Sequence, residues 1–136
     1  MKFTTLRLAG GAILLGLAIV AMTLPEDARR TVGICVGIAS LFLLVLSRLH
    51  LGDSFSVTVK ARALVTKGLY SRIQHPLYFF LDMILWGIIV YFGAVWPLAL
   101  WVLLLLAHIL EARREERVLQ AAFGQTYEAY QSHTWF

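Results

Sequence analysis

Histidine and acidic side chains are the residues of this chain that could carry acid–base or metal chemistry. His108, Glu111 and Glu115 are spaced three and four residues apart, so a helix would present them on one face. Histidine and glutamate at this spacing also occur, in reversed order, in carboxylate-bridged metal sites. Membrane di-iron enzymes are expected to need many more histidines than the four present, which are His50, His75, His108 and His133. We therefore expect no metal site.

Asp82 stands inside an apolar stretch, six residues after Pro76. A carboxylate is costly in hydrocarbon, so it should face the interior of a helix bundle or reach toward the membrane surface. A polar link between helices and a contact to a ligand are both open interpretations.

Several other kinds of site are missing from the sequence. It has no glycine-rich phosphate loop, no serine nucleophile elbow and no stacked aromatic and basic pattern for nucleic acid. The one cysteine, Cys35, lies in an apolar run, which excludes an intramolecular disulfide and a CxxC-type metal site. We expect no nucleic-acid partner, and we expect Cys35 to be a small core residue.

The elements that must position these residues are membrane helices. The chain has 136 residues, of which 60% are apolar and 15% charged, and its mean hydropathy is +0.76. It is too short for a soluble catalytic domain beside its spans, so we expect one all-α integral membrane domain over residues 1–136. The net charge of +4 is interpreted as an orientation signal.

Four spans are predicted, at residues 8–24, 31–47, 77–92 and 97–110. Residues 77–110 are too long for one crossing at about 1.5 Å per residue, and Gly93 and Pro97 provide the break of a hairpin. Residues 25–30 are expected to be a turn. A cleaved signal peptide is the alternative for the first run, but no clear small-x-small cleavage site precedes Pro25, so we expect a retained anchor.

Lysine and arginine predict the orientation of the spans. Ten of the twelve lie in the N-terminus, the segment 48–76 and the tail 111–136. The positive-inside rule then makes the protein multi-pass, with both termini and the long loop in the cytoplasm. Lys60, Arg62 and Lys67 are expected to set orientation or to contact anionic lipid.

The tail is predicted to be a helical extension. Leu119, Phe123, Tyr127 and Tyr130 are spaced to form an apolar and aromatic stripe, and Gly124 is expected to end the membrane helix. An amphipathic helix at the membrane interface is the simplest interpretation.

Two motifs bracket the predicted hairpin. Residues 64–78 read LVTKGLYSRIQHPLY, and residues 115–130 read EERVLQAAFGQTYEAY. The first is similar to the L-V-T-x-G-x-Y-x-x-x-R-H-P-x-Y signature of the isoprenylcysteine carboxyl methyltransferase family and its phospholipid methyltransferase relatives. The second resembles the family's E-E-x-x-L-x-x-x-F-G-x-x-Y-x-x-Y. Together they span residues 64–130, in the C-terminal part of the chain.

The resemblance implies a membrane enzyme that binds S-adenosylmethionine from the cytosol and methylates an acceptor from the lipid. The cofactor-binding residues that it implies are Tyr70, Gln74, His75, Tyr78, Glu115 and Glu116. Gln74 departs from the pattern, because the family usually has arginine there, and Arg72 is a conceivable substitute. No catalytic residue is assigned.

Each charged part of S-adenosylmethionine has a candidate partner in these motifs. Glu115 or Glu116 suits the ammonium or the ribose hydroxyls, and His75 and Gln74 suit the carboxylate. Tyr70, Tyr78 or Phe123 suits the adenine. Neighbours on a helix point about 100° apart, so only one glutamate is expected to face the pocket.

The acceptor is expected to be a lipophilic small molecule or a lipid-anchored group. General bases are scarce at the predicted cytoplasmic rim, which favours a nucleophile competent at neutral pH, such as a prenylcysteine-like carboxylate or a thiol, over an aminophospholipid. Membrane lipid is an expected partner, and the oligomeric state is left open.

Two other functional classes fit the spans. A small four-helix transporter would be expected to have an ionisable residue at mid-membrane, and Asp82 lies nearer the rim. A non-catalytic membrane subunit would explain the spans without explaining the paired motifs.

Overall fold

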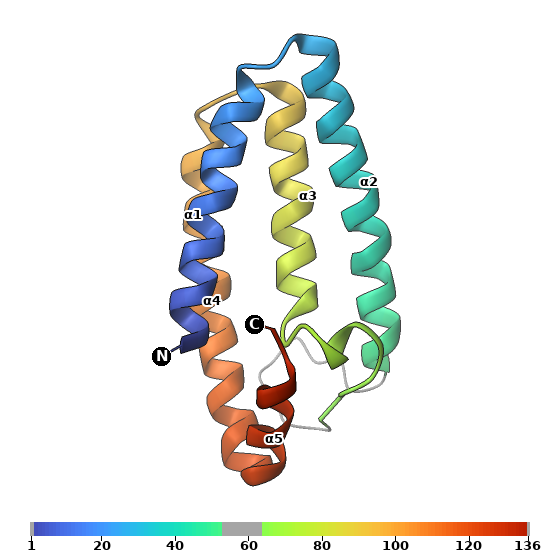
Figure 1. Ribbon diagram of the computed structural model, residues 1–136, viewed down its shortest axis with the longest axis vertical. Helices are drawn as coiled ribbons and strands as arrows, with labels where there is room; N and C mark the ends of the chain where they lie inside the picture. The colour runs from blue at the N-terminus through green and yellow to red at the C-terminus, as the bar shows by residue number, and fades with distance from the viewer. Residues whose placement is uncertain (1, 53–63, 136) are drawn as a thin grey trace.

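The computed structural model describes residues 2–52 and 64–135, and every regular element in these ranges is a helix. Four long helices run side by side in alternating directions, and a short one folds back at one end (Figure 1). The elements are α1 (Lys2–Met22), α2 (Glu26–Leu51), the 3-10 turn η2 (Gly68–Ser71), α3 (Pro76–Phe92), α4 (Pro97–Phe123) and α5 (Gln125–His133). The all-α prediction is confirmed for the described chain.

The turn of the predicted hairpin lies between Gly93, which ends α3, and Pro97, which begins α4. Gly93 ends α3 in the left-handed region, with φ 65°, and its N–H donates to the carbonyl of Ile89 at 2.9 Å. Pro97 begins α4, where a residue without an N–H loses no hydrogen bond. Gly124 ends α4 with a positive φ of 50° but a ψ of −124°, which lies outside the left-handed region, and its N–H donates to the carbonyl of Gln120.

The turn expected over residues 25–30 is wrong, because α2 begins at Glu26. Pro25 precedes the helix, and Glu26 and Asp27 lie in its first turn, where acidic side chains stabilise the positive end of the helix dipole. Other helices also extend beyond their apolar runs: α1 begins at Lys2, and α4 continues through its charged residues to Phe123.

Two helices in the described ranges are long and apolar enough to cross a membrane, over Thr5–Met22 and Glu26–Leu51. Helix α3 is a shorter apolar helix. Much of the apolar surface faces outward, including Ile13, Val20, Ile38, Phe42 and Leu103. Apolar side chains in these outward positions suit contact with lipid.

Helices α2 and α3 approach closely where both carry glycine. A Cβ on Gly33 would lie 2.6 Å from the carbonyl oxygen of Gly87. The other buried residues of α2 are Ser40 and Ser47, so small residues spaced by seven form its packed face. Cys35 lies off this face and is exposed, so its prediction as a core residue is wrong.

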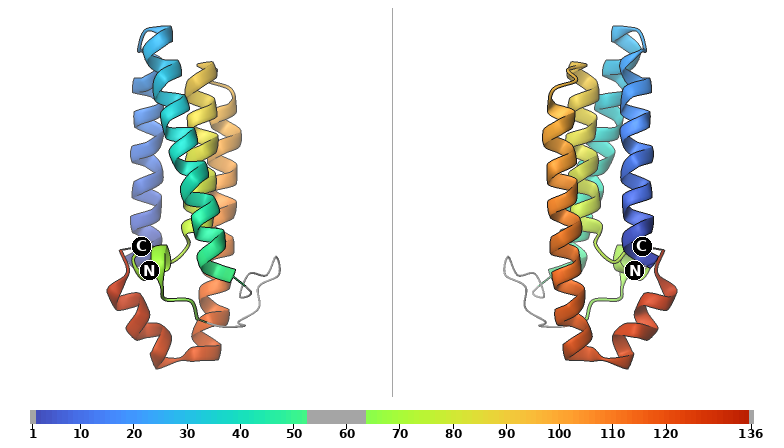
Figure 2. Two further views of the ribbon diagram at one scale, coloured as in Figure 1. Left: turned by 90° about the vertical axis from the view of Figure 1, so that its right-hand side faces the viewer. Right: turned by 90° about the vertical axis from the view of Figure 1, so that its left-hand side faces the viewer.

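The bundle core and the polar end are separate regions of the molecule. Buried Ala18, Trp86, Val90, Leu98 and Trp101 belong to the core cluster. At the other end α4 extends past the bundle, and α5 turns back so that the C-terminus lies near the start of α1 (Figure 2). This end also carries η2 and the start of α3. Lys60 and Arg62 lie outside the described residues.

Candidate active site

The two motifs meet at the end of the bundle where α1 begins. His75 directly precedes Pro76, the first residue of α3, and Glu115 and Glu116 lie on the extended part of α4. Proline pre-sets the backbone for the first helical turn, so His75 is held at the helix entrance.

His75 lies between the two glutamates. Its Nδ1 is 3.3 Å from Glu115 Oε2, and its Nε2 is 3.3 Å from Glu116 Oε1. Both glutamates therefore contact this ring, and the expectation that only one of them faces the cofactor pocket stays a prediction. The two side chains diverge on the helix, but the imidazole presents a nitrogen to each of them.

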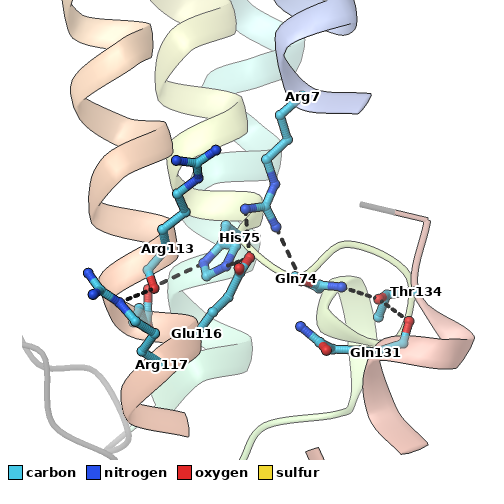
Figure 3. A network of polar contacts seen from close by, with 9 residues as sticks. Arg7, Gln74, His75, Arg113, Glu116, Arg117, Gln131 and Thr134 are labelled. Carbon is cyan, nitrogen blue, oxygen red and sulfur yellow. Dashed lines mark hydrogen bonds and ion pairs between the residues drawn. The ribbon is translucent and has the colours of Figure 1, made fainter. Parts of the chain in front are cut away.

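Arg7 of α1 completes the ion-pair cluster (Figure 3). Its Nη1 is 2.6 Å from Glu116 Oε1, and both side chains are largely buried, at 10% and 18% exposed. An ion pair between side chains this deeply buried is strongly destabilising to break, because removing one partner leaves an uncompensated charge. Arg7 thus joins the first helix to both motifs.

The cluster favours charged His75 and charged Glu116. Burial disfavours the imidazolium, but hydrogen bonds to Glu115 and Glu116 outweigh it and raise the pKa of His75 above its usual 6.5. Burial also opposes the charge of Glu116, but His75 and Arg7 hold the pKa of this carboxyl below its usual 4.5.

Gln74 links the cluster to the C-terminal segment. Nη2 of Arg7 donates to Gln74 Oε1 at 3.1 Å, and Gln74 Nε2 donates to Thr134 Oγ1 at 2.6 Å. Arg72, the conceivable substitute for the missing arginine, lies over the ring of Trp135 instead. The guanidinium beside Gln74 belongs to Arg7.

Tyr70 and Tyr130 join η2 to α5. The hydroxyl of Tyr130 donates to the backbone carbonyl of Tyr70 at 2.6 Å. Burial, with help from Glu115, raises the pKa of Tyr130 to about 12 and also raises the pKa of Tyr70. Both phenols are therefore neutral hydrogen-bonding groups at physiological pH.

Aromatic stacking runs inward from His75 along α3 and α4. Tyr78 stacks on His75 with ring centroids 5.8 Å apart and on His108 with centroids 5.3 Å apart. Both carboxylate oxygens of Asp82 lie 3.1 Å from His108 Nδ1. Asp82 is thus a polar link between α3 and α4, and it reaches the same ring stack as His75.

Two hollows adjoin this stack. A mostly apolar cavity of about 310 Å³ lies between α1, α3 and α4, and its lining includes Arg7, His75, Tyr78, Asp82 and His108. An open groove of about 810 Å³ lies between α4 and α5, lined mainly by polar and charged side chains. Glu116 lines the groove, and its partners Arg7 and His75 line the cavity.

The residues considered for a metal site take separate partners. His108 contacts Asp82, Glu111 pairs with Arg114, and Glu115 contacts His75. Across residues 2–52 and 64–135, no three histidine, cysteine or acidic side chains are grouped to hold a metal ion.

Sequence reasoning brought together Tyr70, Gln74, His75, Tyr78, Glu115 and Glu116 as candidates, and all six lie at this end of the chain's fold. It missed Arg7, Thr134 and the partnership of His108 with Asp82. Arg7 was interpreted as an orientation charge. One observation distinguishes Arg7 from an orientation charge. It lies inside α1, and a cation within a membrane helix needs a partner.

The comparisons with known proteins agree with the two motifs. The family model described as phospholipid methyltransferase matches residues 28–126, which span α2, α3 and α4. No curated protein and no solved structure matches the chain. The family match covers most of the sequence and, with the apolar helices, accounts for both membrane association and methyl transfer. The chain therefore belongs to the phospholipid methyltransferase family.

Proposed function

We propose that this methyltransferase uses S-adenosylmethionine at the cytoplasmic membrane face to methylate a lipophilic acceptor. The observation that carries the proposal is the meeting of His75, Glu115 and Glu116 between a polar groove and an apolar cavity. A charged, water-soluble cofactor and an acceptor from the bilayer need entrances of opposite polarity, and these hollows offer them.

The donor set fits S-adenosylmethionine. Glu115 lines neither hollow, but its side chain is 40% exposed next to His75, so its carboxylate can accept from the ammonium or the ribose hydroxyls of a cofactor that reaches from the groove. Arg7 and Gln74 can donate to the carboxylate, since the guanidinium lies where the family arginine is missing. Tyr70 and Tyr78 offer aromatic faces for the adenine.

Glu116 has a different role in this proposal. Its carboxylate already pairs with Arg7 and His75, so its charge is compensated within the protein. We assign it to holding α1, α3 and α4 in register around the site.

When bound, the cofactor supplies an electrophilic methyl group. The protein's contribution is alignment and the exclusion of water, which together can lower a barrier by several kcal/mol. Leu6, Ile13, Met83, Leu105 and Ile109 line the cavity and suit an apolar acceptor chain. A prenylcysteine-like carboxylate and a thiol are both acceptor groups consistent with this environment.

The topology belongs to the same proposal. We infer four spans formed by α1 to α4, a single domain, and both termini in the cytoplasm. The groove between α4 and α5 would then face the cytosol, where the cofactor is.

Calorimetric titration of the detergent-purified protein with S-adenosylhomocysteine tests the proposed function. We expect saturable binding with one site per chain, and we expect Glu115→Gln to weaken it. Glu26→Gln is the matched control, because Glu26 is an exposed glutamate that pairs with Arg30 on α2 and lines neither hollow. Absence of binding by the unmodified protein would refute the proposal.

A further inference from the structure

Asp82 and His108 form a hydrogen-bonded pair that the cofactor site does not use. Asp82 on α3 is buried, with 5% of its side chain exposed, and His108 faces it from α4. Trp101 donates to the backbone carbonyl of Asp82 and leaves the carboxylate to His108. A carboxylate buried between membrane helices costs free energy unless it is paired, and such residues commonly mark functional sites.

The geometry assigns one tautomer to His108. Both carboxylate oxygens face Nδ1, and an ionised carboxylate can only accept, so the Nδ1–H donates. In the neutral ring Nε2 then carries a lone pair. In the described chain no residue hydrogen-bonds to Nε2, and His108 lines the apolar cavity.

The apolar cavity and the free lone pair on His108 Nε2 together indicate which kind of ligand the cavity would bind. Nε2 of His108 keeps accessible surface, and the ring lines the cavity, so a ligand there can donate a hydrogen bond to this nitrogen. A ligand with an apolar chain and one N–H or S–H group would satisfy both the lining and the imidazole.

The pair also lies at a useful distance from the cofactor site. His108 precedes Glu115 by two helical turns, or about 10 Å along α4 at 1.5 Å per residue. Tyr78 bridges the interval by stacking on both His108 and His75. The cavity therefore has Arg7 and His75 near one end and His108 deeper inside.

We propose that His108 is the general base of the methyl transfer, that Asp82 is its positioning residue, and that the acceptor's nucleophilic atom carries a proton. This proposal rests on the proposed function. It excludes the carboxylate acceptor and leaves thiols and amines on an apolar chain. A carboxylate acceptor has no proton to lose and would make the pair unnecessary.

The proton and electrons balance in one step. The acceptor's N–H or S–H bond breaks, and the proton goes to Nε2 of His108. The electron pair of that bond, or the acceptor's lone pair, forms the new bond to the methyl carbon, whose bond to sulfur breaks with both electrons leaving on sulfur. His108 then returns the proton to water.

Acceptors that share one alkyl chain test the proposal. Purified protein is given methyl-labelled S-adenosylmethionine with dodecanethiol, dodecylamine or dodecanoate, and the same assay is run on His108→Gln. We expect label in the thiol or the amine to fall by about 10²- to 10⁴-fold, the usual contribution of a general base. Imidazole added to His108→Gly should restore part of the rate, which a purely structural role would not allow. The proposal would be overturned if His108→Gln lowered methyl transfer equally for every acceptor, or if the unmodified protein methylated dodecanoate alone.

A second readout needs no turnover. Nitrogen NMR of the histidine-labelled protein should show a protonated Nδ1 and a bare Nε2 for His108 at neutral pH, and Asp82→Asn should abolish that preference. His133→Gln is the control, since this exposed histidine lies on α5. A bare Nδ1 in the unmodified protein would overturn the assignment. If the unmodified protein shows the expected His108 tautomer but does not bind S-adenosylhomocysteine, the proposed function is refuted and the tautomer assignment stands.

Discussion

At the scale of single residues, the site depends on one imidazole shared by two carboxylates. His75 contacts Glu115 and Glu116 at equal distances, but the two glutamates differ in their surroundings. Glu116 is mostly buried and paired with Arg7, and Glu115 is partly exposed. We therefore assign the cofactor contact to Glu115 and the structural ion pair to Glu116, and substitutions can distinguish the two roles.

Glu115→Gln and Glu116→Gln should have different effects. Glu115→Gln should weaken S-adenosylhomocysteine binding by about ten- to a hundredfold, the equivalent of about 1.5–3 kcal/mol, and should lower Tm less than Glu116→Gln does. Glu116→Gln should lower the free energy of unfolding by about 1–3 kcal/mol, because it leaves the Arg7 cation without its partner. Calorimetry and thermal unfolding of both variants check this. Weaker binding in Glu116→Gln alone would reverse our assignment.

The His75 and Glu116 pair predicts a pH optimum for stability. A group with a raised pKa stabilises the fold below its unfolded value, about 6.5 for His75, and loses that effect as pH rises through the folded value. Glu116, with a lowered pKa, stabilises above about 4.5 and loses its effect as pH falls through the folded value. Both groups therefore contribute their full stabilisation between about pH 4.5 and about pH 6.5.

Tm of the detergent-solubilised protein should therefore be higher near pH 6 than near pH 8.5. His75→Gln should remove much of the decline on the alkaline side, and His133→Gln should keep it. A Tm that rises steadily from pH 6 to pH 8.5 would be inconsistent with a charged His75.

At the scale of elements, close helix approach positions α3, which carries Tyr78 and Asp82. Gly33 and Gly87 bring the backbones of α2 and α3 together, so α3 is placed by a contact that lies far from the polar end. Small residues allow such approach in membranes, where dispersion contacts replace the hydrophobic effect as the driving force.

Gly33→Ala should destabilise the protein by about 1–3 kcal/mol, because the new methyl group would overlap backbone atoms of α3. Gly37→Ala is the matched control on the same helix. Its Cβ would meet no atom within 4 Å, so we expect it to be neutral or stabilising by up to about 1 kcal/mol. Thermal unfolding compares the two. Similar Tm values for both variants would argue against the close approach.

At the scale of the whole molecule, alternating helices bring both motifs and the start of α1 to one end (Figure 1). The α3–α4 turn, with exposed Val95, lies at the other end. A protein oriented by its positive charges should therefore present the site to the cytoplasm and this turn to the opposite side.

Cysteine labelling in sealed vesicles checks the orientation. In a Cys35→Ser background, Ser71→Cys and Gln125→Cys should react with an impermeant maleimide from the cytoplasmic side. Val95→Cys should react from the other side. Labelling of positions 71 and 125 from opposite sides would contradict the single-face site.

The sequence by itself predicted the helical class, the hairpin break and the segments that form the site. Gly93 and Pro97 stop helices through their own backbone chemistry, and the order and spacing of the two motifs can be read along the chain. Such features depend on neighbouring residues, so no tertiary information is needed to find them.

Only the tertiary structure decided which faces of the helices meet. Cys35 was misplaced because lipid-facing and core-facing positions of a membrane helix are both apolar, so composition does not separate them. The pairings of Arg7 with Glu116 and of Asp82 with His108 join residues on different helices. Each depends on how the helices are rotated about their axes, and that rotation is set by packing across the whole bundle, such as the contact of Gly33 with Gly87.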